Sequence, residues 1–260
     1  MATVFCLSNE KGGCAKSVTA ASLGFGLARH GKKVLLIDAD AQGSLTISLG
    51  YPQPDKLPVT LATVMGKIIG DEDFDPTADL LHHNEGVDLM PANIRLSKTE
   101  ILLAPEMERE TKLRQYIDMV GPLYEYIVID TSPSLGLMTV NALAASQKVI
   151  IPVAPKFLDV KGLELLLKTI AGLRKRINPR LEISGVLFTM VDGRTNFTRE
   201  IISMIEAAYG GNINIFKDRI PLSVRAAEMS AKGMSIYSYD PKGKVAAAYS
   251  AFVEGVLKIA

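Results

Sequence analysis

Two lysines, Lys11 and Lys16, flank a glycine-rich segment near the start of the chain, within NEKGGCAKS at residues 9–17. This segment follows a short apolar run and precedes a helix-length stretch. Its backbone N–H groups and the positive end of the helix can therefore face a phosphate. In such a loop Lys16 would reach the β- and γ-phosphates of a nucleotide, and the Ser17 hydroxyl would bind Mg²⁺. The residue types and their spacing predict a nucleotide site.

The loop departs from the usual phosphate-binding pattern. G-x-x-x-x-G-K-[ST] requires glycine at positions 10 and 15, where this chain has Glu10 and Ala15. The deviant pattern K-G-G-x-G-K-[ST] fits at every position except Ala15, and it accounts for the second lysine, Lys11. Ala15 adds a Cβ to a turn in which glycine lets the backbone approach the ligand closely.

Three aspartates follow apolar runs: Asp38 and Asp40 come after VLLI, and Asp130 comes after YIVI. The carboxyl ends of parallel strands meet at one edge of a sheet, and ligands of such sheets bind there. Asp130 has the position of an aspartate that holds Mg²⁺ through its water shell. Each aspartate alone would suit a turn or a helix N-cap equally well. The three together with the lysine loop favour a nucleotide and metal site.

Short apolar runs alternate with helix-length segments along the chain. Unbroken Val/Ile/Leu runs are typical of parallel strands that are buried on both faces. The alternation predicts an α/β fold, doubly wound, with a mostly parallel sheet and helices on both faces. The predicted strands are Thr3–Ser8, Lys33–Ile37, Val87–Met90, Tyr126–Asp130, Lys148–Val153, Ile183–Thr189 and Ile215–Phe216. The clearest predicted helices are Ser17–His30, Leu158–Ile177, Arg199–Tyr209 and Lys244–Leu257, and residues 51–85 are expected to form peripheral helices and loops.

Composition limits the possible functions. The 260 residues suit one domain with one core, and the net charge of +1 excludes a uniformly basic nucleic-acid binder. The charge is uneven, however. Residues 1–155 hold 13 Lys/Arg and 18 Asp/Glu, a balance of −5, and residues 156–260 hold 16 and 10, a balance of +6. Two cysteines, Cys6 and Cys14, cannot form a disulfide framework, and the absence of a signal peptide or a spanning apolar run predicts a cytoplasmic protein.

These motifs resemble those of the ParA/Soj partition ATPases, a family within the deviant Walker A group that also includes MinD. NEKGGCAKS is similar to the family's signature loop, VLLIDADAQGS to its second motif and YIVIDTSPSLG to its Walker B strand. Residues 185–201 and 219–249 resemble its C-terminal blocks. The resemblance covers nearly the whole chain and implies a P-loop ATPase that uses ATP and Mg²⁺.

The resemblance also implies a role for each matching residue. Lys11 corresponds to the signature lysine, which crosses to the ATP of the partner subunit in a sandwich dimer. Lys16 would act on the phosphates of its own subunit, and Asp40 would orient the attacking water. The implied nucleotide contacts are Gly12, Gly13, Cys14, Ala15, Lys16, Ser17, Val18 and Pro221, and the implied metal-site residues are Ser17, Asp38 and Asp130. Ala15 and Val18 depart from the family's glycine and threonine, which predicts weaker nucleotide binding or slower turnover.

Basic residues of the C-terminal part are candidates for DNA contact. Arg194 and Arg225 match positions that resemble the family's non-specific DNA-binding arginines, although Leu222 stands where many relatives have a further basic residue. Lys161, Lys168 and Lys175 recur every seven residues and so share one outer stripe of a predicted helix; such a stripe is often only a solvated face. The implied partners are non-specific double-stranded DNA, a ParB-like centromere-binding protein and a second copy in an ATP-dependent homodimer.

The chain begins at its first predicted strand, so we expect one domain over residues 1–260, no N-terminal helix-turn-helix domain, and a nucleoid-associated protein. Three other functions stay open. An ATP-gated interaction protein with negligible hydrolysis would be compatible with Ala15 and Val18. A MinD-like membrane ATPase would need a basic amphipathic C-terminal helix, and the terminal residues AAYSAFVEGVLKIA contain one lysine. A small-molecule ligase on the same fold would need substrate-binding residues that the sequence does not reveal.

Overall fold

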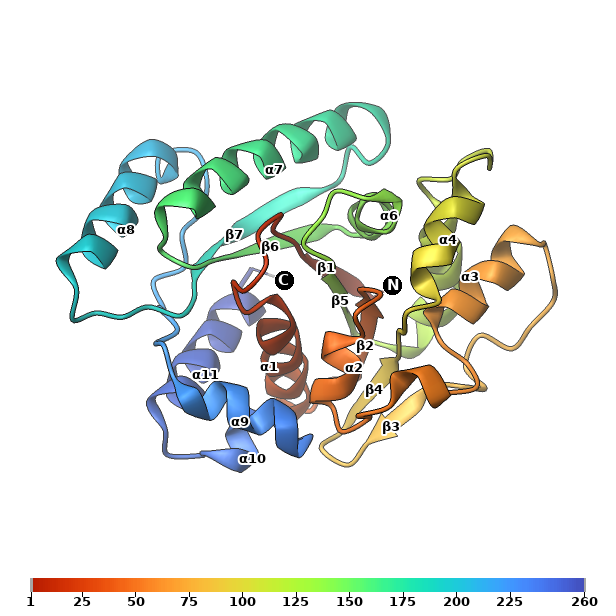
Figure 1. Ribbon diagram of the computed structural model, residues 1–260, viewed down its shortest axis with the longest axis horizontal. Helices are drawn as coiled ribbons and strands as arrows, with labels where there is room; N and C mark the ends of the chain where they lie inside the picture. The colour runs from red at the N-terminus through yellow and green to blue at the C-terminus, as the bar shows by residue number, and fades with distance from the viewer. Residues whose placement is uncertain (1, 260) are drawn as a thin grey trace.

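A computed structural model describes the backbone of residues 2–259 and their side chains except those of residues 157–160. Its described strands form one seven-stranded sheet in the order β3-β4-β2-β5-β1-β6-β7 (Figure 1). The strands are β1 (Thr3–Leu7), β2 (Val34–Ala39), β3 (Leu81–His83), β4 (Val87–Met90), β5 (Tyr126–Thr131), β6 (Lys148–Val153) and β7 (Glu182–Phe188). Only β3 runs antiparallel to its neighbour among these strands.

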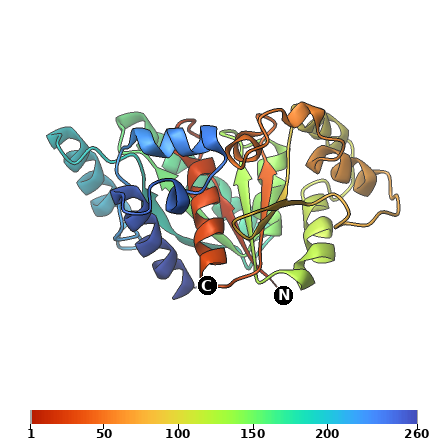
Figure 2. The same ribbon diagram turned by 90° about the horizontal axis from the view of Figure 1, so that it is seen from below.

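Helices cover both faces of the sheet, as Figure 2 shows along its edge. One face carries α3 (Leu61–Ile69), α4 (Leu96–Leu103), α5 (Lys112–Val120), α6 (Leu137–Ala145), α7 (Phe157–Arg176) and α8 (Asn196–Tyr209). The other carries α1 (Lys16–Arg29), α2 (Ser44–Ser48), α9 (Val224–Lys232), α10 (Ile236–Tyr239) and α11 (Lys244–Leu257). Two short 3-10 turns, at Pro54–Lys56 and Gly121–Leu123, join elements. The predicted doubly wound α/β fold is confirmed.

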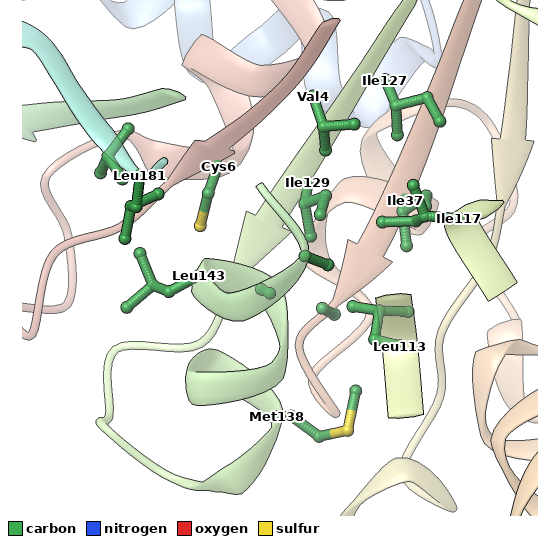
Figure 3. Close-up of a cluster of buried hydrophobic side chains, with 14 of the residues drawn as sticks. Val4, Cys6, Ile37, Leu113, Ile117, Ile127, Ile129, Met138, Leu143 and Leu181 are labelled. Atoms are coloured by element: carbon green, nitrogen blue, oxygen red, sulfur yellow. The ribbon is translucent and has the colours of Figure 1, made fainter. Parts of the chain in front are cut away.

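Side chains of the central strands alternate between the two layers because successive residues of a strand point to opposite faces. Figure 3 shows Val4 and Cys6 of β1 on the same side as Ile127 and Ile129 of β5, facing α5 and α6. Their strand neighbour Phe5 lies in the opposite core, among residues of α1 and α11. The Cys6 side chain is fully buried, and this burial raises the pKa of its thiol. The thiolate form is therefore disfavoured, as expected for an inert core cysteine.

Two sequence expectations about strands were wrong. Ile215–Phe216 does not form a strand: Ile215 makes only an isolated bridge to Val186. The chain follows the edge of β7 through scattered bonds only: the N–H groups of Phe216 and Ile220 donate to the carbonyl oxygens of Val186 and Phe188 at 2.9 and 2.8 Å. The Phe216 ring lies in the core, where it meets the Phe252 ring edge-on with centroids 4.9 Å apart. Conversely, β3 lies inside residues 51–85, which were expected to be helices and loops. Its three residues are only half-buried or exposed, so they lack the apolar pattern of a buried strand.

None of the described helices is both long enough and apolar enough to cross a membrane. The helix at α11 buries its apolar residues, among them Tyr249, Phe252 and Val256, in the core against the sheet. Its apolar side therefore faces protein.

Candidate nucleotide-binding site

The glycine-rich loop joins the end of β1 to the start of α1 and is held by side-chain hydrogen bonds. The Asn9 amide donates to the carbonyl oxygen of Pro152 in β6 at 2.7 Å and accepts the Lys11 N–H at 3.0 Å. The Thr189 hydroxyl, just beyond β7, donates to the Cys14 carbonyl at 2.9 Å. These bonds fix the loop to two neighbouring strands, as a phosphate cradle requires.

Ala15 occupies a conformation that favours glycine. Its backbone angles are φ 59° and ψ 34°, in the left-handed region, and α1 begins at the next residue. An L-residue with a Cβ pays about 1–2 kcal/mol for this conformation, because the Cβ crowds the following carbonyl oxygen. The departure noted at Ala15 is therefore a strained position in the loop and not a harmless replacement.

The side chains of Lys16 and Lys11 both lie against other parts of the protein. Lys16 is 7% exposed, and its ammonium donates to the Lys11 carbonyl oxygen at 3.0 Å. The half-buried Lys11 side chain lies against α7, where a Cβ built on Gly162 would be 3.1 Å from its Cγ. Gly162 thus leaves the space in which the aliphatic part of Lys11 rests.

Asp38 and Asp130 meet at the carboxyl ends of β2 and β5, where they are register partners. Both are fully buried. Among the described residues, neither oxygen of Asp130 has a partner at full hydrogen-bond geometry. Burial and then the charge of Asp38 raise the pKa of Asp130 well above its usual value, while Ser17 and Lys16 act in the opposite direction. A buried carboxylate without a partner, beside a serine hydroxyl, offers the oxygen ligands that Mg²⁺ prefers, so these residues fit the metal.

Asp38, in contrast, is fully engaged within the chain. Its Oδ1 accepts the Asp40 N–H at 3.1 Å, and its Oδ2 accepts the N–H and hydroxyl of Thr46 at 2.8 and 2.7 Å. Burial raises the pKa of Asp38 to about 6, against the opposing effect of the Thr46 and Asp40 bonds. Asp38 lies beside Asp130 at the carboxyl end of the sheet, and its expected place near the metal stays a prediction. Its oxygens, however, serve the loop that carries Asp40.

Asp40 lies at the same edge of the sheet as Asp130 and the glycine-rich loop. Its side chain is 8% exposed, and its Oδ1 accepts the Gln42 N–H at 3.0 Å. The carboxylate is consequently fixed by its own turn and by the Asp38 bond to its backbone. A buried, oriented carboxylate of this kind can accept a hydrogen bond from a water molecule and hold it in one direction.

An apolar pocket of about 250 Å³ adjoins the loop. Gly13, Ala15 and Val18 line one side, and Pro221 lines the other. The rest of its wall comes from Met190, Ile220, Leu222, Ser223, Ala226, Ala227 and Tyr249. A flat apolar group such as a nucleotide base suits this lining. Sequence reasoning named Pro221 but missed Met190 and Tyr249, because nothing local marks residues that are brought to the loop from distant segments.

The candidate DNA-binding residues do not lie on a single layer. Arg194 lies in the loop after β7 and Arg225 in the first turn of α9, and the segments that precede them are joined by a bridge between Val191 and Pro221. The Arg194 side chain is 87% exposed and pairs with Asp192, which lowers the pKa of Asp192 to about 2. The exposed Arg225 guanidinium lies 5.9 Å from the centre of the Tyr239 ring.

The lysine stripe is elsewhere. Lys161, Lys168 and Lys175 are all exposed on α7, which packs on the face of the sheet opposite to α9. Lys168 pairs with Glu164 at 2.6 Å in the (i, i+4) arrangement of a solvated helix face. The basic residues of the C-terminal part are therefore divided between two layers and do not form one basic face. The cause is topological, because the chain crosses the sheet edge between α8 and α9.

Comparison with known proteins agrees with this geometry. Residues 2–183 match a family model described as an AAA domain. The sporulation initiation inhibitor protein Soj of Bacillus subtilis is 38% identical over 251 residues, which cover 96% of each chain. The chromosome partitioning protein ParA of Caulobacter vibrioides is 36% identical over 251 residues, covering 95% of this chain and 90% of ParA. This chain belongs to the ParA/Soj family of P-loop ATPases.

Solved structures place the ParA/Soj chain among similar folds. A Mycobacterium smegmatis protein described as cobyrinic acid a,c-diamide synthase, with bound ADP and magnesium, is 34% identical with a TM-score of 0.85, covering 99% of this chain and 95% of that one. The cell division ATPase MinD of Pyrococcus furiosus has a TM-score of 0.78 at 22% identity and covers 100% of both chains. The MinD likeness supports the fold alone.

Proposed function

We propose that this ParA/Soj-family protein is a DNA-partition ATPase. Binding of Mg-ATP joins two copies in a sandwich dimer, the dimer binds double-stranded DNA without sequence preference, and hydrolysis stimulated by a ParB-like centromere-binding protein resets the cycle. The observation that carries the proposal is the unpartnered carboxylate of Asp130 beside Ser17 and Lys16, at the edge of the sheet that also holds Asp40. Residues 1–260 act in it as one ATPase domain, in the cytoplasm and on the nucleoid.

Each residue has a physical task in this reaction. Ser17 and Asp130 would hold Mg²⁺, which would neutralise charge on the phosphates. The Lys16 ammonium, together with the backbone N–H groups from Gly12 to Val18, stabilises the phosphate oxygens as negative charge develops on them. Asp40 orients the attacking water. Phosphoryl transfer needs such positioning and charge stabilisation more than covalent chemistry.

Dimerisation brings a further positive charge, the Lys11 ammonium of the other copy, to each nucleotide. Lys11 leaves the surface of α7 at Gly162 and extends to the nucleotide of the partner subunit. Its aliphatic part rests in the space that the absent side chain of Gly162 leaves. A cation supplied in trans makes hydrolysis depend on the dimer.

DNA contact is assigned to Arg194 and Arg225 first. The segments that precede them are bridged through Val191 and Pro221, and Pro221 lines the nucleotide pocket, so a change at Pro221 can reach both. Lys161, Lys168 and Lys175 form a second, more distant contact on α7. Contacts made to phosphates alone give weak, salt-dependent binding, which two copies in a dimer strengthen.

The test is retention of DNA fragments of unrelated sequence with ATP, ADP or no nucleotide, for the wild type, Arg225→Ala and Lys175→Ala. We expect retention with ATP alone, a salt dependence that falls with each lost contact, and a larger loss for Arg225→Ala. Equal retention in all three nucleotide states contradicts the switch. Asp40→Ala should still dimerise on ATP but fail to turn over, and persisting turnover would show that Asp40 is not the water-orienting group.

Two observations favour a second candidate, an ATP-gated interaction protein with negligible hydrolysis. Ala15 holds a left-handed conformation in the cradle, and Val18 lines the pocket without a hydroxyl. ATP-dependent DNA retention with no turnover, even with a ParB-like partner present, would select this candidate.

The MinD-like alternative is weakened by α11, because its apolar side is buried against the sheet and is not available to a membrane. The mycobacterial relative carries the name of a synthase. ATP turnover that depends on a small carboxylic acid and not on DNA would favour such an activity for this chain.

A further inference from the structure

Thr46 links Asp38, at the end of β2, to the segment that follows β4. It is fully buried in the first turn of α2. Its hydroxyl donates to Asp38 Oδ2 at 2.7 Å, and the same oxygen accepts the backbone N–H of Ala92 at 3.0 Å. The hydroxyl thus uses its donor and one acceptor site at once, and it joins the end of β2 to the segment that follows β4.

The bonds continue from Thr46 to the proposed catalytic group. The Asp38 carboxylate accepts from Thr46 on one oxygen and from the Asp40 N–H on the other, at 3.1 Å. The orientation of Asp38 therefore sets the position of the Asp40 backbone. A chain of buried hydrogen bonds without a solvent-exposed member is rigid, because breaking any one leaves a polar group unsatisfied.

A second contact holds the same loop independently. Gly43, directly before α2, has φ 62°, and a Cβ built on it would be 3.0 Å from the Ala92 carbonyl oxygen and 3.3 Å from Pro54 Cγ. The loop is therefore in close contact with the segment whose N–H group binds Thr46. Both contacts hold Gly43 and Thr46 against the segment that follows β4.

We propose that Thr46 is a positioning residue for ATP hydrolysis: through Asp38 it fixes the Asp40 carboxylate in the direction needed to orient water. This inference rests on the proposed function and deepens it. Thr46 contacts neither nucleotide nor metal in this role, so it governs turnover and not nucleotide affinity. Asp38 correspondingly acts as the link between Thr46 and Asp40 and not as a ligand of the metal.

The experiment compares Thr46→Val, which removes the hydroxyl at nearly constant shape, with Thr46→Ser, which keeps it. Thr46→Val should lower kcat by about 10- to 100-fold, the usual penalty for a misplaced catalytic group, and should change ATP affinity by less than about twofold. Thr46→Ser should restore kcat. Thr99→Val, at another buried threonine on α4, is the matched control and should leave turnover unchanged.

A second measurement does not depend on hydrolysis. Hydrogen exchange at the Asp40 and Ala92 amides, in the chain without nucleotide, should be about tenfold faster in Thr46→Val and close to wild type in Thr46→Ser. Thr46→Ala replaces Thr46→Val if the valine variant melts below the assay temperature. Unchanged Asp40 exchange together with wild-type kcat in the hydroxyl-free variant overturns the proposal, as does a serine variant that fails to rescue. A wild type without turnover contradicts the proposed function, and the exchange data still decide whether Thr46 holds the loop.

Discussion

Asp38 and Asp130 are the same residue type, equally buried and paired in register at the ends of adjacent strands, yet their surroundings differ completely. Asp38 accepts three hydrogen bonds from its own chain, while Asp130 accepts none at full geometry from the described residues. The first carboxylate is satisfied when the chain folds. We propose that the second is satisfied by the bound metal.

This difference in hydrogen bonding indicates that the two carboxylates at this edge of the sheet have different roles. A buried carboxylate without a partner is costly, so it persists where a bound cation compensates it. A carboxylate that is bonded to the loop beside it instead stabilises that loop. On this view, stability and ligand binding are assigned to neighbouring residues of identical chemistry, and substitutions at the two sites should have opposite effects.

The largest expected effect is at Asp130. Asp130→Asn should reduce ATP turnover by about 100- to 1,000-fold, because a charge that holds the metal and stabilises the reaction is lost. It should nevertheless raise the unfolding free energy of the nucleotide-free protein, by about 1–3 kcal/mol, since an uncompensated buried charge disappears. Turnover with Mg²⁺ and denaturant unfolding without it measure the two effects. A loss of stability in this variant would contradict the comparison.

The pH dependence of stability follows from the same two groups. Folding raises the pKa of Asp38 from 3.8 to about 6 and raises that of Asp130 well above 3.8. The folded state therefore holds protons that the unfolded state releases, and this contribution to stability is lost as pH rises from about 4 through 6 and above. Asp130→Asn should make the decline with pH shallower. Unfolding curves at a series of pH values, without nucleotide, measure it.

A smaller and opposite effect is expected at Asp38. Asp38→Asn should lower the unfolding free energy by about 1–3 kcal/mol, because the amide NH₂ would oppose the Asp40 N–H donor. Asp88→Asn is the matched control: Asp88 accepts bonds from His82 and Tyr124 but is 27% exposed at the start of β4. Asp88→Asn should lower the unfolding free energy by less than about 1 kcal/mol and leave turnover unchanged. Equal losses at both positions would argue against a special role for the Asp38 bonds.

The smallest effect tests the loop that faces Asp130. Ala15→Gly should raise stability by up to about 1 kcal/mol, because glycine adopts φ 59° without the Cβ penalty. Ala28→Gly, at an ordinary helical position of α1, should instead lower stability by about 0.5–1 kcal/mol. The melting temperatures of the two variants, compared with that of the wild type, measure these opposite effects. Melting temperatures that fall in both variants would show that the loop is not strained at Ala15.

Much of the fold was predictable because it depends on local patterns. Continuous apolar runs identified six of the seven strands, and the missed strand, β3, is short and half exposed. The positions of Lys16, Ser17 and Asp130 at strand and helix ends followed from the same patterns. The lysine stripe on α7 was also predicted correctly as exposed. The separation of this stripe from Arg225 was not predicted, because helical spacing carries no information about which face of a sheet a helix covers.

Local patterns along the chain are enough to predict the class of fold, the glycine-rich loop and the meeting of the aspartates at one edge, since parallel strands bring their carboxyl ends together. Which carboxylate oxygens accept hydrogen bonds depends instead on how distant segments pack. Thr46 lies in α2 and Ala92 follows β4, while the two anchors of the glycine-rich loop, Pro152 and Thr189, lie in β6 and just beyond β7. Hydrogen bonds between such distant segments depend on packing geometry at the scale of tenths of an ångström. Residue spacing along the chain does not encode that geometry. The geometry is what makes Asp38 a hydrogen-bonded structural residue and leaves Asp130 without a partner at full hydrogen-bond geometry among the described residues.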